Sequence, residues 1–144
     1  MNLRAFLEES PFTTFLESCW DGECYQEFPV ASGKIGCDPG GVNAQVLFFL
    51  IYAEKLKLRN AVPGRAAKLA VRLAGLVRED GLCRTNDGVS DHPAYASTIG
   101  DALGTAVWYA DVIGLDAEGC KTVLAASAST TSCMVAAQDR KSTR

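Results

Sequence analysis

The sequence predicts an all-α protein with about five helices in stacked α-hairpin repeats, amounting to two and a half units. Residues 21–24 and 80–83 share the pattern Asp-Gly-Xaa-Cys, and they lie 59 residues apart. Each segment is followed by a polar loop and then by a long apolar run. An internal repeat of this length is typical of supersecondary units that share one core. We therefore expect the two long loops to lie on one face of the molecule.

The elements of the first unit follow from local signals. Ser10 and Pro11 favour the start of a short helix, which the Asp-Gly pair at residues 21–22 ends. Residues 21–41 contain too many glycines and prolines for a regular element and are expected to form a long loop. Residues 42–58 are apolar almost all round, which indicates a buried helix.

The second unit repeats this order. Residues 60–64 predict a turn, residues 67–77 a helix, residues 81–93 a loop with a tight turn at 86–88, and residues 94–113 a helix. Within that last helix, Gly100 and Gly104 indicate a groove against which another helix packs closely. Asp116 is expected to cap a fifth helix to about residue 137, which the Ser/Ala/Thr tract 125–131 could interrupt.

Composition indicates one domain. The chain has 144 residues, 48% of them hydrophobic and 22% charged, which are ordinary values for a folded protein. We expect a single helical repeat domain over residues 1–138, with residues 139–144 as a frayed tail. A net charge of −3 makes nucleic acid an unexpected partner. The basic residues between positions 55 and 72 could form a stripe for an anionic partner or the solvated faces of two helices.

The sequence also gives expectations about the cellular setting. The N-terminus reaches acidic residues before any long apolar stretch, so it lacks a secretory signal pattern. The longest apolar run, residues 46–53, is too short to span a bilayer. A cytoplasmic protein without a membrane span is therefore expected. In that compartment the six cysteines are explained as buried small side chains or metal ligands.

Residues 76–81 and 95–103, with weaker counterparts in the first unit, resemble the hairpin unit of α/α-toroid proteins of the terpenoid cyclase and protein prenyltransferase families. Those families close a barrel from more hairpins than this chain holds. The chain is thus expected to be a fragment, a subunit that completes its barrel by oligomerising, or an unrelated helical-hairpin protein that has the same turn chemistry. The prenyltransferases bind zinc through Asp, Cys and His, which here would be Asp21, Cys24, Cys83 and His92. Structural cysteines and a loop histidine explain the same residues without a metal.

Two functions are consistent with these observations. In the first, the loops at 22–41 and 82–93 form a binding surface for a protein partner, a second copy of the chain or an apolar ligand, without a cofactor. The aromatic anchors of that surface would be Trp20, Tyr25, Phe28, His92 and Tyr95. In the second, the chain is part of a toroid-type enzyme that acts on an apolar substrate, with zinc as its possible cofactor.

Overall fold

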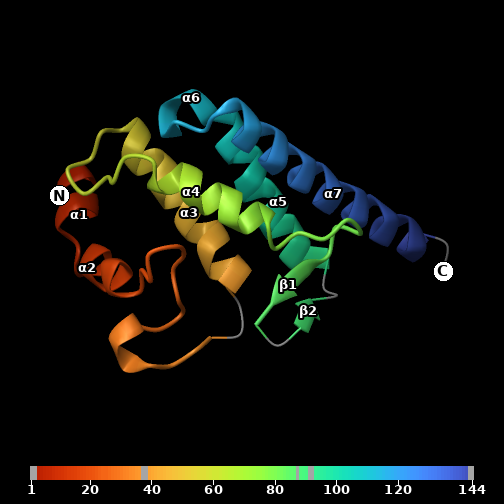
Figure 1. Cartoon of the computed structure of the whole chain (residues 1–144), viewed down its shortest axis with the longest axis horizontal. Helices are drawn as coiled ribbons and strands as arrows, with labels where there is room; N and C mark the ends of the chain where they lie inside the picture. Colours follow the sequence, from red (N-terminus) through yellow and green to blue (C-terminus); the bar gives the residue numbers. More distant parts are fainter. Residues whose placement is uncertain (1–2, 37–38, 87, 91–92, 143–144) are drawn as a thin grey trace.

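A computed structural model describes residues 3–36, 39–86, 88–90 and 93–142, and these residues are mostly helical (Figure 1). This confirms a mainly α-helical protein. Seven α-helices and one two-stranded sheet occur in the described ranges. The elements are α1 (Leu3–Glu9), α2 (Pro11–Ser18), the short 3₁₀ helix η1 (Val30–Ser32), α3 (Pro39–Lys55), α4 (Arg65–Ala74), β1 (Cys83–Thr85), β2 (Gly88–Ser90), α5 (Pro93–Trp108), α6 (Ala110–Ile113) and α7 (Ala117–Ser142).

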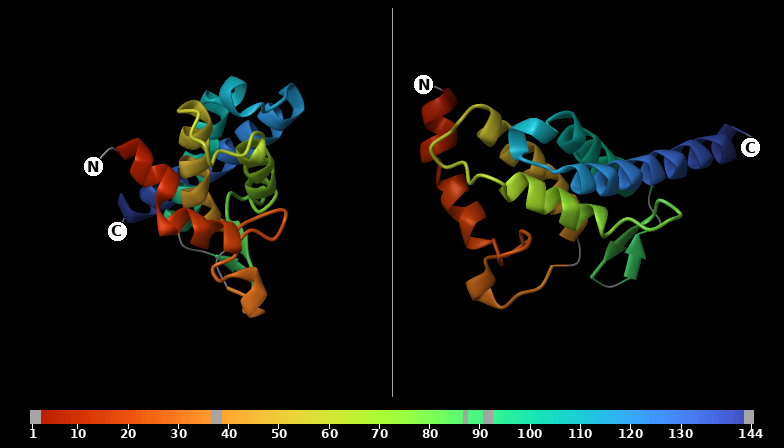
Figure 2. Two further views of the ribbon diagram at one scale, coloured as in Figure 1. Left: turned by 90° about the vertical axis from the view of Figure 1, so that its left-hand side faces the viewer. Right: turned by 45° about the horizontal axis from the view of Figure 1, so that its top comes forward.

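The long helices pack around one core. Figure 1 shows α5 and α7 side by side, and α3 and α4 pack against α5 and against each other. Buried leucine, isoleucine, valine and alanine side chains from these four helices fill the space between them. In the second view of Figure 2, the C-terminal end of α7 continues past the other helices. No helix in the described ranges has both the length and the apolar character that crossing a membrane requires.

The two Asp-Gly segments fold alike. The carboxylate of Asp21 accepts hydrogen bonds from the backbone N–H groups of Glu23 and Cys24, both at 2.8 Å. The carboxylate of Asp80 accepts one from the backbone of Leu82 at 3.1 Å. The glycine after each aspartate has a positive φ, 104° and 78°, which is the region that glycine adopts without strain. Both segments are therefore Asx turns, as their composition indicates.

The two helix starts predicted at Ser10 and Asp116 are confirmed. The Ser10 side chain accepts a hydrogen bond from the backbone of Phe12 at 3.2 Å, with Pro11 as the first residue of α2. Asp116 accepts one from the backbone of Gly119 at 2.7 Å at the start of α7. In each case a side-chain oxygen satisfies a backbone donor that has no partner within the helix.

Three parts of the chain differ from the prediction. Helix α1 was not predicted, and the loop after residue 81 contains the hairpin β1–β2, in which Thr85 pairs with Gly88. The predicted helix over residues 94–113 is two helices, α5 and α6. Tyr109 separates them with a backbone (φ −106°, ψ 23°) outside the helical region. Seven helices therefore replace the five expected.

Helix α7 runs without a break to Ser142, beyond the end predicted near residue 137. Its Ser/Thr tract is helical too, and the hydroxyl groups there donate hydrogen bonds back to helix carbonyls. Thr130 and Thr131 both donate to the carbonyl of Ser127, at 2.7 and 3.0 Å, and Ser132 donates to that of Ala128 at 3.1 Å. Side-chain hydroxyls in this position do not compete for the backbone N–H groups, so the helix continues.

The N-terminal arm, defined as residues 3–36, places Leu16, Cys19, Cys24 and Tyr25 in the core and is also attached to it through charges. The cations on the α3–α4 connection and on α4 bind acceptors in the arm. These contacts are Arg59 with Glu8 at 2.9 Å, Arg65 with Glu17 at 2.5 Å, Lys68 with the Gly22 carbonyl at 2.5 Å, and Arg72 with Glu23 at 3.9 Å. The basic run therefore faces an anionic segment of its own chain.

Close packing of α5 on α7 generates a first prediction. Ser127 donates a hydrogen bond to the Gly100 carbonyl at 3.1 Å, and a Cβ at Gly100 would collide with the Thr130 hydroxyl. Gly100→Ala should therefore destabilise the protein by about 1–3 kcal/mol through overpacking. The matched control is Gly104→Ala, whose Cβ would lie 3.5 Å from the Ser127 hydroxyl and fits. That control should be neutral or up to about 1 kcal/mol stabilising through helix propensity. Urea unfolding measures both, and equal effects would contradict the prediction.

Candidate functional site

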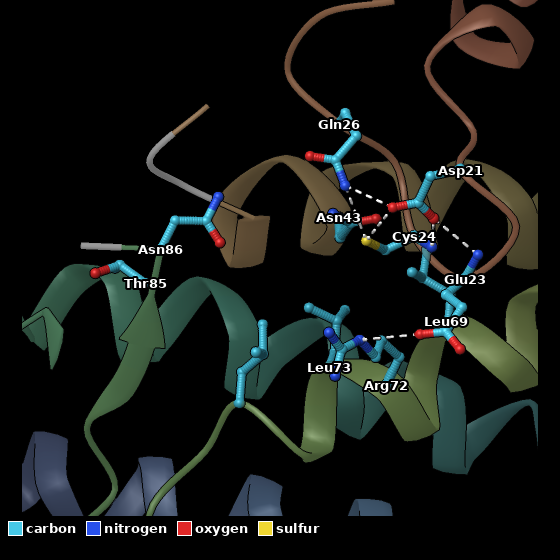
Figure 3. A pocket seen from close by; sticks show the side chains of 11 residues that line it. Asp21, Glu23, Cys24, Gln26, Asn43, Leu69, Arg72, Leu73, Thr85 and Asn86 are labelled. Carbon is cyan, nitrogen blue, oxygen red and sulfur yellow. Dashed lines mark hydrogen bonds and ion pairs between the residues drawn. The ribbon is translucent and has the colours of Figure 1, made fainter. Parts of the chain in front are cut away.

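A small polar pocket lies where the two long loops meet. The side-chain amide of Asn86, at the tip of the hairpin, donates a hydrogen bond to the carbonyl of Gly36 in the first loop. The pocket has a volume of about 140 Å³. Its walls come from the Asp21 turn, from the hairpin and from α4, three segments far apart in the sequence (Figure 3).

Asn43 fixes the Asp21 turn in place. Its carboxamide oxygen accepts from the backbone N–H of Tyr25, and its amide donates to the Tyr25 carbonyl, both at 2.7 Å. Asn43 is buried on α3, and Tyr25 is buried beside it. Because a buried amide and backbone pair satisfy each other completely here, the turn is held rigidly against α3.

Both carboxylate oxygens of Asp21 accept hydrogen bonds within the turn. One carboxylate oxygen accepts the two backbone N–H groups of the turn, and the other accepts from the Gln26 amide at 2.6 Å and from the Cys24 thiol at 3.5 Å. Partial burial opposes ionisation, but these hydrogen bonds outweigh it and hold the pKa of Asp21 below its ordinary value. Asp21 is therefore an ionised structural group whose oxygens all have donors.

Cys24 lies in the pocket as a protonated thiol. Burial raises the pKa of Cys24, and the charge and hydrogen bond of Asp21 raise it further, whereas Arg72 acts in the opposite direction. Figure 3 shows the sulfur beside Asp21 and Gln26, with Arg72 below. Since the thiolate is both the nucleophile and the metal ligand, this environment opposes both kinds of chemistry.

The opposite walls of the pocket are less constrained. Arg72 lies 3.9 Å from Glu23, and 52% and 69% of these two side chains remain exposed. Leu69 and Leu73 of α4 form an apolar floor, and Asn86 lies across from Cys24 (Figure 3). An exposed ion pair at this distance contributes little stability, so its partners can turn toward a ligand.

The four residues expected as zinc ligands are only partly brought together. Asp21 and Cys24 are neighbours, but Cys83 is fully buried in the core and lies near Asp80 and Cys133 instead. His92 lies outside the described residues. Within the described ranges, no group of three or more His, Cys, Asp or Glu side chains is placed to hold a metal ion.

The five expected aromatic anchors also differ in their settings. Trp20 is half-buried, with the Arg65 guanidinium 4.8 Å from its ring, whereas Tyr25 is 0% exposed and belongs to the core. Phe28 is exposed, with the Lys34 amine 5.5 Å from its ring. The Tyr95 hydroxyl accepts a hydrogen bond from the backbone of Gly40 at 3.1 Å. His92, the fifth, is not described. Their role in binding a partner stays a prediction.

Sequence reasoning missed Gln26, Arg72 and Asn86 as pocket residues. Arg72 belongs to the basic run and Asn86 to a turn, and neither setting distinguishes a site residue from a surface residue. Comparison with protein-family models, with curated proteins and with solved structures finds no match to this chain. The properties of the pocket itself must therefore support any functional conclusion.

The Cys24 environment generates a second prediction. Asp21→Asn keeps an oxygen for the turn but removes the charge that disfavours the Cys24 thiolate. Alkylation of Cys24 at pH 8 should then accelerate by roughly 2- to 10-fold, because the thiolate is the reactive form. Iodoacetamide labelling followed by peptide mapping measures the rate. Asp80→Asn, the equivalent change in the other Asx turn, is the control and should leave it unchanged. A rate in Asp21→Asn no faster than in this control would contradict the assignment.

Cys83 generates a third prediction, on pH. Burial raises its pKa from 9.0 to about 11. Between these values the unfolded chain loses the thiol proton and the folded chain keeps it, so rising pH favours unfolding. The stability that this thiol contributes is complete below pH 9 and falls by up to about 2–3 kcal/mol as the pH rises through 11. Urea unfolding at several pH values measures this, and Cys83→Ala should show a correspondingly smaller fall. The prediction would be wrong if the free energies of unfolding of the two proteins fell in parallel as the pH rises.

Proposed function

We propose that this protein is a binding protein that uses its loop face to hold a small polar ligand. One observation carries the proposal, namely that two loops far apart in the sequence meet at one pocket. That pocket combines charges of both signs, side-chain amides and an apolar floor. A concave site where a few polar groups converge over apolar side chains is the usual form of a ligand site.

The size of the pocket limits the ligand. A volume of about 140 Å³ is close to that of an engineered protein cavity of about 150 Å³ that holds benzene. The ligand is therefore a molecule of about six non-hydrogen atoms, or a group of that size on a larger partner. This is smaller than the ligands of ordinary drug-sized pockets, which exceed about 300 Å³.

The charges of the pocket limit the ligand further. Asp21 has no oxygen left for a ligand and holds the amide of Gln26, so the groups that can turn inward are Arg72 and Glu23. A ligand with one acidic and one basic group satisfies both partners of the loose Arg72–Glu23 pair. Small zwitterions of the amino-acid class meet this requirement and the size limit together.

The state of Cys24 supports binding over thiol catalysis. A catalytic cysteine needs an environment that stabilises the thiolate, whereas burial and the Asp21 carboxylate raise the pKa of Cys24. In the binding role, the thiol serves as a weakly polar surface and remains protonated.

We also infer that α2–α3 and α4–α5 are two copies of one helical unit. In each, an Asx turn with a positive-φ glycine follows the first helix, and an isolated backbone bridge closes the turn. The bridges join Trp20 to Tyr25 and Val77 to Cys83. On this basis, the pocket lies between equivalent loops of neighbouring units, which is where repeat proteins commonly bind ligands.

A titration of the isotope-labelled protein with alanine tests the proposed function. Alanine is a zwitterion of six non-hydrogen atoms, and acetate and methylammonium carry its two charges separately. Alanine should shift the backbone NMR signals of Cys24 and Asn86 with a dissociation constant of about 1 mM. The single-charge probes should bind more weakly. Arg72→Ala should abolish the alanine effect.

The matched control is Arg78→Ala. Arg78 is also half-exposed and pairs with Asp80 at 2.9 Å, outside the pocket. This variant should bind alanine as the unmodified protein does. Absence of localised shifts with all three probes, or equal loss in both arginine variants, would overturn the proposed function.

A further inference from the structure

A second concavity, separate in chemistry from the polar pocket, lies between α2 and α3. It has a volume of about 430 Å³ and is mainly apolar. Its most prominent side chains are Phe12 and Phe15 of α2, which are 55% and 50% exposed. Exposed aromatic side chains that line one concavity mark an interaction site more often than a solvent-facing surface. We call this concavity the α2–α3 groove.

Both walls of the groove carry apolar residues at helical spacing. On α2 and its C-terminal cap they are Phe12, Phe15, Leu16 and Cys19, and on α3 they are Val42, Val46 and Phe49. Each set follows the i, i+3 or i+4, i+7 pattern, which is the stripe that one helix presents to another. Two such stripes side by side form the surface on which a third helix packs.

The two ends of the groove differ. At one end the rings of Phe12 and Phe49 meet edge to face, with centroids 6.3 Å apart. At the other end α2 finishes, and the backbone N–H of Gln26 donates to the carbonyl of Cys19 at 2.8 Å. This places Gln26 and Glu27 at the polar end of an otherwise apolar surface.

The charge at the groove is negative. Among the described residues that line it, Glu27 is the one charged side chain. Like charges across an interface are strongly unfavourable, so this surface selects a basic occupant.

We propose that the α2–α3 groove binds an amphipathic α-helix of a partner protein, with its apolar face against Phe12 and Phe15 and a basic side chain toward Glu27. The open shape favours a helix over a small apolar molecule, because small ligands bury most of their surface in their sites. The proposal rests on the groove alone and does not depend on the polar pocket.

Two synthetic peptides test this proposal with the full chain. Both have roughly 14 residues, about four helical turns, with leucine at i, i+3, i+4 and i+7. In one peptide the other face carries lysine, and in its match it carries glutamate. Fluorescence anisotropy should show micromolar binding of the lysine peptide and at least roughly tenfold weaker binding of the glutamate peptide.

Variants then locate the site. Phe15→Gln should weaken binding of the lysine peptide at least roughly tenfold, since it removes a central aromatic contact. Val71→Gln is the matched control, because Val71 is an apolar residue of α4 that is 42% exposed and lies outside the groove. Glu27→Gln should reduce the preference for the lysine peptide.

Four results would overturn the proposal. Equal affinity for the two peptides would remove the charge argument, and equal affinity of Phe15→Gln and Val71→Gln would place the peptide elsewhere. A dimer in light scattering that Phe15→Gln converts to a monomer would make a second copy of the chain the occupant. Saturable NMR shifts at the groove with octyl glucoside, without peptide binding, would instead identify a small apolar ligand site.

Discussion

The position of the Asp21 turn, and of the pocket that it lines, depends on the pairing of Asn43 with the backbone of Tyr25. This side chain is buried on α3, and it satisfies both polar groups of one residue in the Asp21 turn. Without it, a backbone donor and acceptor would be buried without partners, at a cost of roughly 1–3 kcal/mol each. The side chains of Asp21, Cys24 and Gln26 belong to that turn. The pairing therefore sets the position of the polar pocket and of one end of the α2–α3 groove.

Electrostatic attraction within the chain complements this contact. The cations of α4 and of the loop before it bind the acidic N-terminal arm, and the Arg65 guanidinium also lies over the Trp20 ring. Exposed ion pairs contribute little individually, so they supplement the burial of arm residues such as Leu16 and Tyr25 in the core. On α2, Leu16 is buried while the phenylalanine side chains stay partly open to solvent.

The sequence predicted the features that local chemistry determines. Ser10 and Asp116 cap helices, and Gly100 admits a neighbouring helix, each through contacts that a few residues specify. The small sheet, the break at Tyr109 and helix α1 were missed, because tertiary packing decides them. For the site, the Asp-Gly-Xaa-Cys motif identified Asp21 and Cys24. Arg72 and Asn86 could not be identified, since α4 and the hairpin meet the turn only in the folded chain.

Gln26 lines both the polar pocket and the α2–α3 groove. Its side-chain amide bonds to Asp21, and its backbone bonds to Cys19 at the end of α2. One residue thus acts as a partition between two concavities of opposite polarity. A ligand that displaced Gln26 from one concavity would alter the wall of the other, and the occupancies of the two would then be thermodynamically linked. If one occupant changes the binding free energy of the other, the other changes the binding free energy of the first by the same amount.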